Sequence, residues 1–119
     1  MYDILTLNKI SQIGLKELDS KYTVSDACEN PDGIIVRSAA MHEFDFSEKT
    51  LAVARAGAGV NNIPVDKCTE KGIAVFNTPG ANANAVKELV LAGLLLSSRD
   101  IVGGIEWAKT LKDTAVLAV

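Results

Sequence analysis

The sequence predicts an α/β fold built on a parallel sheet, and three observations lead to this prediction. Short apolar segments alternate with helical patterns along the whole chain. Glycine, proline and asparagine mark several of the boundaries between these segments. The chain has 119 residues, of which 48% are hydrophobic, and this suffices for one core. We therefore expect a single core.

Five segments have the composition of strands, and they set the predicted topology. Residues 33–37 form a continuous run rich in β-branched side chains, as expected for a parallel strand covered on both faces. Residues 22–24 form a short strand, for which an edge position is expected. The other strands are expected at residues 2–7, 51–54 and 73–76. Five strands with helical connections fit a flavodoxin-like, doubly wound sheet of order 2-1-3-4-5 in three layers.

The connections between these strands contain two helical patterns and one turn. Residues 11–18 carry apolar side chains at helical spacing, with Ser11 as a cap. Residues 64–71 place a proline in the first turn of a helix that Gly72 stops. Residues 47–49 suit a short helical turn.

The last third of the chain is expected to be mainly helical. A long helix is predicted at residues 85–99, with Asn84 as its cap. Its apolar residues are expected along one face, namely Val86, Leu89, Val90, Gly93 and Leu94. The pair Gly103-Gly104 is expected to loosen the chain, after which residues 105–111 can be helical again. Residues 114–119 are apolar.

Composition and charge argue against several functional classes. The formal net charge of −3, without runs of Lys or Arg, gives no support for nucleic-acid binding. The uncharged apolar stretch at residues 89–98 is about half a membrane span, and the start has no basic segment of a signal peptide. Cys28 and Cys68 are far apart and are expected to be buried small hydrophobes, without a disulfide or a metal site. We expect a soluble cytoplasmic protein.

The most informative segment is residues 55–63, RAGAGVNNI, which directly follows a predicted strand. Two glycines one residue apart let a backbone or a ligand approach closely. The carboxyl ends of parallel strands are where ligands bind in open α/β sheets. A dinucleotide fingerprint would need a third glycine where Asn62 stands, and a long helix that starts inside the motif. The loop therefore predicts an anion site other than the pyrophosphate site of NAD.

Four segments, in this order and spacing, carry a family resemblance. They are Ile35-Val36-Arg37-Ser38, residues 55–63, residues 72–79 (GIAVFNTP), and Asn82 followed by Val86-Lys87-Glu88-Leu89. Together they resemble the substrate-binding domain of D-isomer-specific 2-hydroxyacid dehydrogenases. The resemblance runs from Tyr2 to about Leu111. Within that family, the pattern is most similar to the members that oxidise 3-phosphoglycerate in serine biosynthesis.

The resemblance implies a domain organisation, a cofactor and partners. Residues 1–97 correspond to the substrate-binding domain, and residues 98–119 to an interdomain helix and linker. In the family, a Rossmann domain binds NAD and carries the catalytic residues, and that domain is expected beyond this chain. The chain alone is therefore expected to bind a small anionic 2-hydroxy acid without catalysing hydride transfer. The complete enzyme is expected to be a homo-oligomer.

The resemblance also assigns substrate contacts. Arg37 and Ser38 correspond to a pair that binds the substrate phosphate, through the guanidinium and through the Ser38 hydroxyl and backbone N–H. An arginine that snorkels at a strand end is the alternative. Ala58 and Gly59 would offer backbone N–H groups to the substrate carboxylate, or else form a tight turn without a ligand. Asn82 would reach the substrate, or else form an Asx turn.

Other residues are assigned smaller roles. Val86, on the first turns of the long helix, is a candidate cofactor contact, while Glu88 is expected to pack against the second domain. Asn62 is expected to be structural, and His42 is expected to be a solvated loop residue without a catalytic role. The family often has a further basic residue after the Arg-Ser pair. Here residues 39–41 are neutral, so some phosphate-binding charge is missing or is supplied elsewhere.

The alternatives concern the substrate and the class of protein. Glycerate, glyoxylate, lactate or formate enzymes share the architecture, and the Arg37-Ser38 pair favours a phosphorylated acid. A standalone small-anion-binding module would use the same residues without chemistry. A flavodoxin-like receiver or electron carrier fits poorly, because an acidic cluster after the first strand and aromatics to stack on a flavin are missing.

Overall fold

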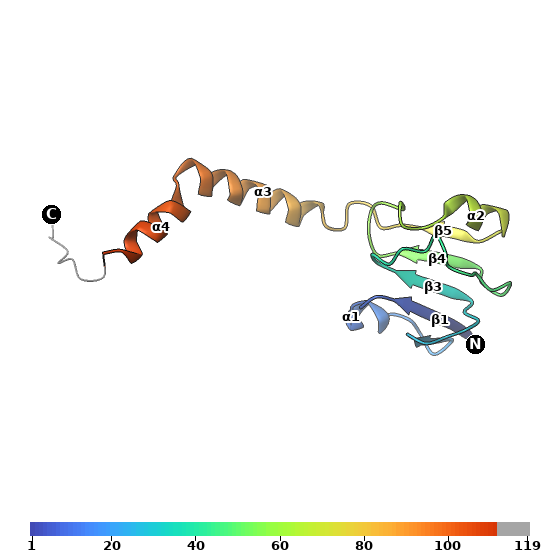
Figure 1. The fold of residues 1–119 in the computed structure, drawn as a ribbon. Coiled ribbons are helices and arrows are strands. Elements are labelled where there is room, and N and C mark those ends of the chain that lie inside the picture. Colours follow the sequence, from blue (N-terminus) through green and yellow to red (C-terminus); the bar gives the residue numbers. More distant parts are fainter. Residues whose placement is uncertain (112–119) are drawn as a thin grey trace. The chain divides into compact units, whose positions relative to one another are not determined.

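The computed structural model describes residues 1–111 and contains one five-stranded sheet (Figure 1). The strand order is β2-β1-β3-β4-β5 and every neighbouring pair is parallel, which confirms the predicted topology. The strands are β1 (Tyr2–Leu7), β2 (Tyr22–Ser25), β3 (Gly33–Val36), β4 (Ala52–Arg55) and β5 (Ala74–Phe76). The helices are α1 (Gln12–Leu15), α2 (Val65–Glu70), α3 (Ala83–Ser98) and α4 (Ile101–Lys109).

The elements up to β5 lie close to where they were predicted. β4 and β5 each begin one residue later than expected, and α2 is stopped by Gly72 in a left-handed conformation with φ 70°. The first helix was predicted too long, because α1 has only four residues. Ile13 is 80% exposed, so burial does not stabilise a longer helix there. Ser11 lies at the N-cap, but its side chain accepts no capping hydrogen bond.

One face of the sheet forms the core. Leu5, Ile34 and Val53 are in register on neighbouring strands, and all three are buried. Because side chains alternate along a strand, these positions point to the same side of the sheet. Buried residues from α2 and from the loops after β3 and β4 complete this core, namely Met41, Phe46, Ile63 and Cys68.

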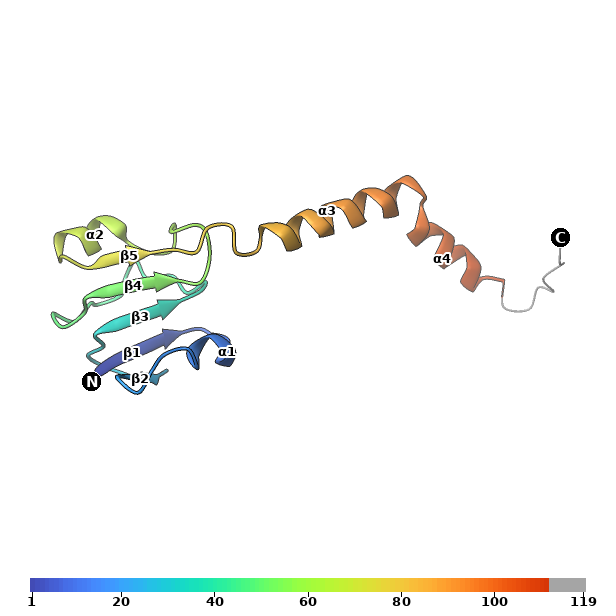
Figure 2. The same ribbon diagram turned by 180° about the vertical axis from the view of Figure 1, so that it is seen from behind.

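The opposite face is covered less completely. Ile4, Ile35 and Ala54 are partly buried there, and with Leu18 they line an apolar hollow of about 120 Å³. Leu18 follows α1, so α1 and α2 lie on opposite faces of the sheet, in the predicted doubly wound, three-layer arrangement (Figures 1 and 2). The expectation that the third strand is covered on both faces is wrong for Ile35, because α1 is too short to cover it.

The start of α3 differs from the prediction. The helix begins at Ala83, so its N-cap is Asn82 rather than Asn84. Asn84 lies inside the helix, where its side chain accepts a hydrogen bond from Lys87 Nζ and donates one to Glu88 Oε1. Local side-chain pairs on the helix surface thus replace the predicted cap.

The two glycines after α3 do not loosen the chain. Gly103 and Gly104 both lie inside α4. Asp100, at the N-cap, has a left-handed backbone, and its carboxylate accepts a hydrogen bond from the Gly103 N–H. A side-chain cap on the first turn therefore offsets the low helix propensity of glycine.

The apolar side chains of α3 and α4 are exposed. Neither helix contains a buried residue. The predicted single apolar face of α3 is wrong, because Leu91 and Leu95, which lie off that face, are also apolar and at least 51% exposed. Such a pattern, apolar around much of the helix, is typical of a helix that is buried on several sides.

The chain forms two compact units, one ending at Ala81 and the other beginning at Asn82. The functional boundary between residues 97 and 98 falls inside the second unit and stays a prediction. Among the described helices, none is long and apolar enough to cross a membrane. Residues 112–119 lie outside the described residues. They include the apolar terminal segment and the last part of the linker predicted at residues 98–119.

Candidate anion-binding site

Polar side chains gather where three neighbouring strands end. Asn8 follows β1, Arg37 follows β3, and Arg55 is the last residue of β4. β1 pairs with β3, and Val36 of β3 is in register with Arg55. Because the strands are parallel, their carboxyl ends meet at one end of the sheet, which we call the carboxyl end. It is the candidate site.

The segment Arg37-Ser38-Ala39 is fixed by one side chain from the neighbouring strand. Asn8 Oδ1 accepts hydrogen bonds from the three backbone N–H groups at 3.3, 2.9 and 2.8 Å. The Ser38 N–H, which was expected to face a ligand, donates to Asn8 in this structure, and its contact with a ligand stays a prediction. The exposed Arg37 guanidinium and the Ser38 hydroxyl form no hydrogen bond within residues 1–111.

Arg55 supplies a second cation, which sequence reasoning missed. Its Nε donates to the Arg37 carbonyl at 3.0 Å, and its Nη1 lies 3.4 Å from Asn61 Oδ1. The guanidinium uses space left by two glycines, since a Cβ on Gly59 would lie 2.8 Å from Nη1 and one on Gly57 3.3 Å from Nε. The sequence did contain a signal for Arg55, because this basic residue ends the strand next to the one that Arg37 follows. The positive charge that is missing at residues 39–41 is thus present on the neighbouring strand.

The loop after β4 presents free backbone donors. The N–H groups of Ala58 and Gly59 donate to no acceptor in the described part of the chain. The carbonyls of this loop are held from β5, because Asn77 Nδ2 donates to the Ala58 carbonyl at 2.7 Å and the Thr78 N–H donates to the Gly57 carbonyl at 2.9 Å. Unpaired N–H groups on a fixed loop are what a carboxylate site requires.

Asn62 and His42 join the loops that follow β3 and β4. Asn62 is buried, its Nδ2 donates to the Ala39 carbonyl at 2.8 Å, and its own carbonyl accepts the Met41 N–H at 2.8 Å. These contacts confirm the structural role predicted for Asn62. His42 is exposed in the loop after β3, as expected, and its Nε2 lies 3.0 Å from the Asn61 carbonyl.

The carboxyl end of the sheet carries positive charge without a partner. Every ion pair among the described residues involves a lysine, and neither Arg37 nor Arg55 pairs with a carboxylate there. A guanidinium matches the planar oxygen pairs of phosphate and carboxylate groups. Two arginines on adjacent strand ends, with a loop of free N–H groups, can therefore bind a small anion.

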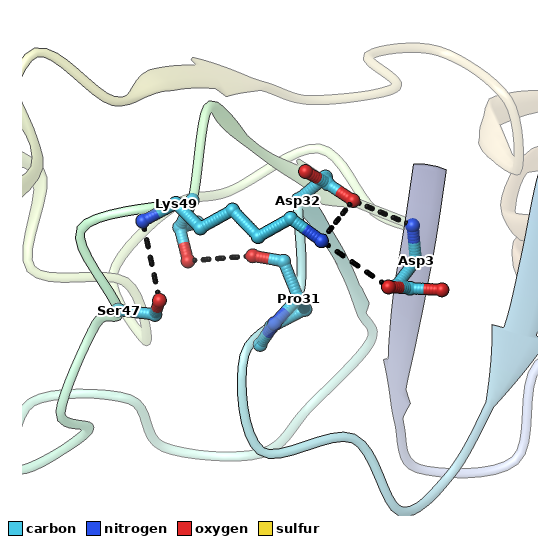
Figure 3. A network of polar contacts seen from close by, with 6 residues as sticks. Asp3, Pro31, Asp32, Ser47 and Lys49 are labelled. Atoms are coloured by element: carbon cyan, nitrogen blue, oxygen red, sulfur yellow. Dashed lines mark hydrogen bonds and ion pairs between the residues drawn. The ribbon is translucent and has the colours of Figure 1, made fainter. Parts of the chain in front are cut away.

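The amino end of the same sheet has the opposite character (Figure 3). Asp32 Oδ2 accepts the Asp3 N–H at 2.7 Å and pairs with Lys49 Nζ at 3.0 Å, and Lys49 also pairs with Asp3 at 3.2 Å. The hydrogen bond from the Asp3 N–H and the one from Lys49 hold the pKa of Asp32 below its ordinary value. The hydrogen bonds to Asp32 and Asp3 raise the pKa of Lys49. Here opposite charges satisfy one another, as in a structural network.

Asn82 and Val86 belong to the second unit, which is described by itself. Asn82 is the N-cap of α3, but its side chain accepts no capping hydrogen bond. The alternative role considered for Asn82, an Asx turn, is therefore not observed as a capping hydrogen bond on α3. Val86 lies on the first turn of α3 and is 52% exposed. The substrate contact of Asn82 and the cofactor contact of Val86 stay predictions.

The two thiols belong to the packing of the sheet unit. Cys68 is buried in the core, and burial raises the pKa of its thiol, which makes it unreactive. Cys28 is partly buried against the same core, and both cysteines are free. Within residues 1–111, no group of three or more His, Cys, Asp or Glu side chains could hold a metal ion.

Comparisons with known proteins show what this chain is similar to. Residues 2–115 match the family model described as the D-isomer specific 2-hydroxyacid dehydrogenase, catalytic domain. The chain is 48% identical to the hydroxypyruvate reductase of Thermotoga maritima over 73 residues, which cover 59% of the chain and 24% of that protein. It is 33% identical to the D-3-phosphoglycerate dehydrogenase of Methanocaldococcus jannaschii over 101 residues, which cover 82% of the chain and 19% of that protein.

Solved structures show the same relationship. The NAD⁺-bound 3-phosphoglycerate dehydrogenase of Entamoeba histolytica is similar to 80% of this chain, with a TM-score of 0.63 and 28% sequence identity. The match covers 38% of that structure's chain. The chain thus spans between about a fifth and a quarter of the length of the two curated relatives.

Proposed function

The chain belongs to the D-isomer specific 2-hydroxyacid dehydrogenase family, and on this premise we propose that it is the substrate-binding part of an NAD-dependent D-3-phosphoglycerate dehydrogenase. Such an enzyme oxidises 3-phosphoglycerate to 3-phosphohydroxypyruvate in serine biosynthesis. In this proposal the chain binds the acid and orients it, and by itself it does not catalyse hydride transfer.

The observation that carries the proposal is the pair of arginines without carboxylate partners at the carboxyl end of the sheet. The substrate has two anionic groups, a phosphate and a carboxylate. We assign the phosphate to the Arg37 guanidinium and the Ser38 hydroxyl, and the carboxylate to the free N–H groups of Ala58 and Gly59. Arg55 contacts the Arg37 carbonyl and lies against Gly59, so it adds positive charge between the two groups.

The residues of this chain do not fit the pyrophosphate of NAD. The loop has buried Asn62 where a dinucleotide loop needs its third glycine, and α2 has only six residues. We therefore place NAD binding mainly outside the described residues, with Val86 as a candidate contact. The NAD⁺-bound relative supports the use of NAD by the complete enzyme.

An unphosphorylated substrate is the second candidate, and one comparison favours it. The relative that is 48% identical is a hydroxypyruvate reductase. Hydroxypyruvate and the corresponding hydroxy acid, glycerate, have a carboxylate but no phosphate. The neutral residues 39–41 after Ser38 would suit such an acid. Glyoxylate and lactate would also satisfy a site that holds only a carboxylate.

The exposed helices support a partner within the same enzyme. α3 and α4 bury no residue, and large apolar patches on monomers usually mark interaction sites. We propose that the enzyme's own Rossmann domain covers these helices, and that the complete enzyme is a cytoplasmic homo-oligomer. A standalone anion-binding module is the alternative, and it would leave the apolar helices in contact with water.

An NMR titration of the isotope-labelled 119-residue chain tests the proposal. With 3-phosphoglycerate we expect saturable shifts of the amide signals of Ser38, Ala58 and Gly59. Glycerate and lactate are the matched ligands without a phosphate, and they should shift mainly the signals of Ala58 and Gly59. Equal saturation by glycerate would favour the second candidate. The absence of shifts with all three acids would contradict an anion site in this chain.

A further inference from the structure

We propose that Asn8 is the positioning residue of this anion site, and that its side chain holds Arg37 and Ser38 in the geometry that a bound phosphate requires. This inference rests on the proposed function and deepens it, because it adds a residue that need not contact the ligand. Its evidence is a convergence of hydrogen bonds on one atom.

Three successive N–H groups, those of Arg37, Ser38 and Ala39, donate to Asn8 Oδ1 at 3.3, 2.9 and 2.8 Å. Consecutive N–H groups that point to one place form a concavity of the kind that binds anions. In this protein the amide oxygen of Asn8 fills the concavity. A neutral oxygen satisfies the donors without bringing negative charge close to Arg37. The N–H groups therefore fix the segment and leave anion binding to the side chains.

The backbone of Asn8 is shaped for this contact. Its φ of 76° lies in the left-handed region, which asparagine tolerates better than most residues. Leu7 and Val36 are in register, so a turn directly after β1 brings the Asn8 side chain to the residues that follow β3. An unfavourable backbone conformation at this point is consistent with a side chain that has one specific position to reach.

Two carbonyls of the segment are held as well. Arg55 Nε donates to the Arg37 carbonyl at 3.0 Å, and Asn62 Nδ2 donates to the Ala39 carbonyl at 2.8 Å. Asn8 after β1, Arg55 at the end of β4, and Asn62 in the loop after β4 thus fix this backbone segment. Removing Asn8 would release three N–H groups together, and the ligand would then have to order the segment when it binds.

Two variants of Asn8 and one matched control test this role. Asn8→Gly keeps the left-handed backbone and removes the acceptor oxygen, whereas Asn8→Asp retains an acceptor at the same place. Asn30→Gly makes the same substitution at an exposed residue before β3, at the other end of the sheet. For each chain we would measure the hydrogen exchange of the Ser38 and Ala39 amides without ligand, and the affinity for 3-phosphoglycerate by calorimetry.

In Asn8→Gly we expect the two amides to exchange about tenfold faster, and 3-phosphoglycerate to bind about tenfold more weakly. Asn8→Asp should restore the slow exchange but not the affinity, because its carboxylate brings negative charge close to Arg37. Asn30→Gly should behave like the unaltered chain in both measurements. Unchanged exchange or unchanged affinity in Asn8→Gly would contradict the role of Asn8 alone. An unaltered chain that does not bind 3-phosphoglycerate would contradict the proposed function, and this inference with it.

Discussion

The two ends of one sheet use charge in opposite ways. At the amino end, Lys49 Nζ lies 3.2 Å from Asp3 Oδ2 and 3.0 Å from Asp32 Oδ2, so each carboxylate has a cation beside it (Figure 3). At the carboxyl end, Arg37 and Arg55 have no carboxylate partner among residues 1–111. The side-chain hydrogen bonds that fix this end come mainly from asparagine amides and from Arg55 itself, and no carboxylate takes part in them.

This difference separates a structural network from a candidate binding site. A carboxylate that fixed the loops at the carboxyl end would also neutralise the arginines, and an anion would then gain little by binding there. Asparagines at positions 8, 62 and 77 satisfy backbone groups without changing the charge. Positive charge at the carboxyl end therefore remains available for a ligand. At the amino end, the charged side chains pair with one another and connect β1 with the segments that precede β3 and β4.

The largest effect is expected from Arg55→Ala. This change removes one of the two free cations and the donor to the Arg37 carbonyl, so the affinity for 3-phosphoglycerate should fall about tenfold or more. Calorimetry on the purified chain measures it. Arg55→Lys is the matched variant, because it keeps the positive charge but not the planar guanidinium. Its affinity for 3-phosphoglycerate should lie between those of the unaltered chain and Arg55→Ala. An unchanged affinity in Arg55→Ala would contradict the claim that the positive charge at the carboxyl end serves anion binding.

Asp32→Ala should lower the stability of the fold and leave anion affinity unchanged. The variant removes a buried carboxylate that accepts the Asp3 N–H and pairs with Lys49. The melting temperature followed by circular dichroism should therefore fall by several degrees, while the affinity for 3-phosphoglycerate stays the same. Glu70→Ala removes an exposed carboxylate of α2 that forms no ion pair among the described residues, and it serves as the control. Loss of anion affinity in Asp32→Ala would mean that the two ends of the sheet are coupled.

Gly59→Ala should have a smaller effect, confined to binding. The new Cβ would lie 2.8 Å from Arg55 Nη1, which is the end of a flexible side chain, so the guanidinium can move away with little cost in stability. We expect affinity for 3-phosphoglycerate to fall a few-fold and the melting temperature to change little. Gly14→Ala places a Cβ where no atom lies within 4 Å, and its affinity should equal that of the unaltered chain.

The smallest effect concerns pH. Folding lowers the pKa of Asp32 below 3.8, so its contribution to stability is present above pH 3.8 and is lost as pH falls through the folded-state pKa. Folding raises the pKa of Lys49 above 10.5, so its contribution is present below pH 10.5 and is lost as pH rises further. Melting curves across pH should show both losses, and Asp32→Ala should reduce them. Unaltered slopes in the variant would contradict the assignment.

The sheet and part of the site could be predicted because they depend on local patterns. Apolar segments that alternate with helical ones gave the strand order, and the position of Arg37 after a strand placed it at the carboxyl end. Asn62 was recognised as structural. Asn8 and Arg55 were missed, because their contacts join residues 29 to 31 and 18 positions apart in the sequence. Only the register of the strands brings such residues together.

The helices after residue 82 show a second limit of sequence reasoning. A periodic apolar face was expected on α3 because a helix usually packs against one core. The helix instead carries exposed leucines on several sides. In our proposal these leucines contact a further domain, and the periodicity of one helix does not indicate such contacts. The glycines of α4 were misjudged for a similar reason, since the cap at Asp100 offsets their propensity.

The most direct test of the account combines two changes, one in the protein and one in the ligand. The affinities of the unaltered chain and of Arg37→Ala are measured by calorimetry for 3-phosphoglycerate and for glycerate. The account predicts that the unaltered chain prefers the phosphorylated acid about tenfold or more, and that Arg37→Ala loses this preference while it still binds glycerate. A preference that survives in Arg37→Ala, or an unaltered chain that binds both acids equally, would contradict it.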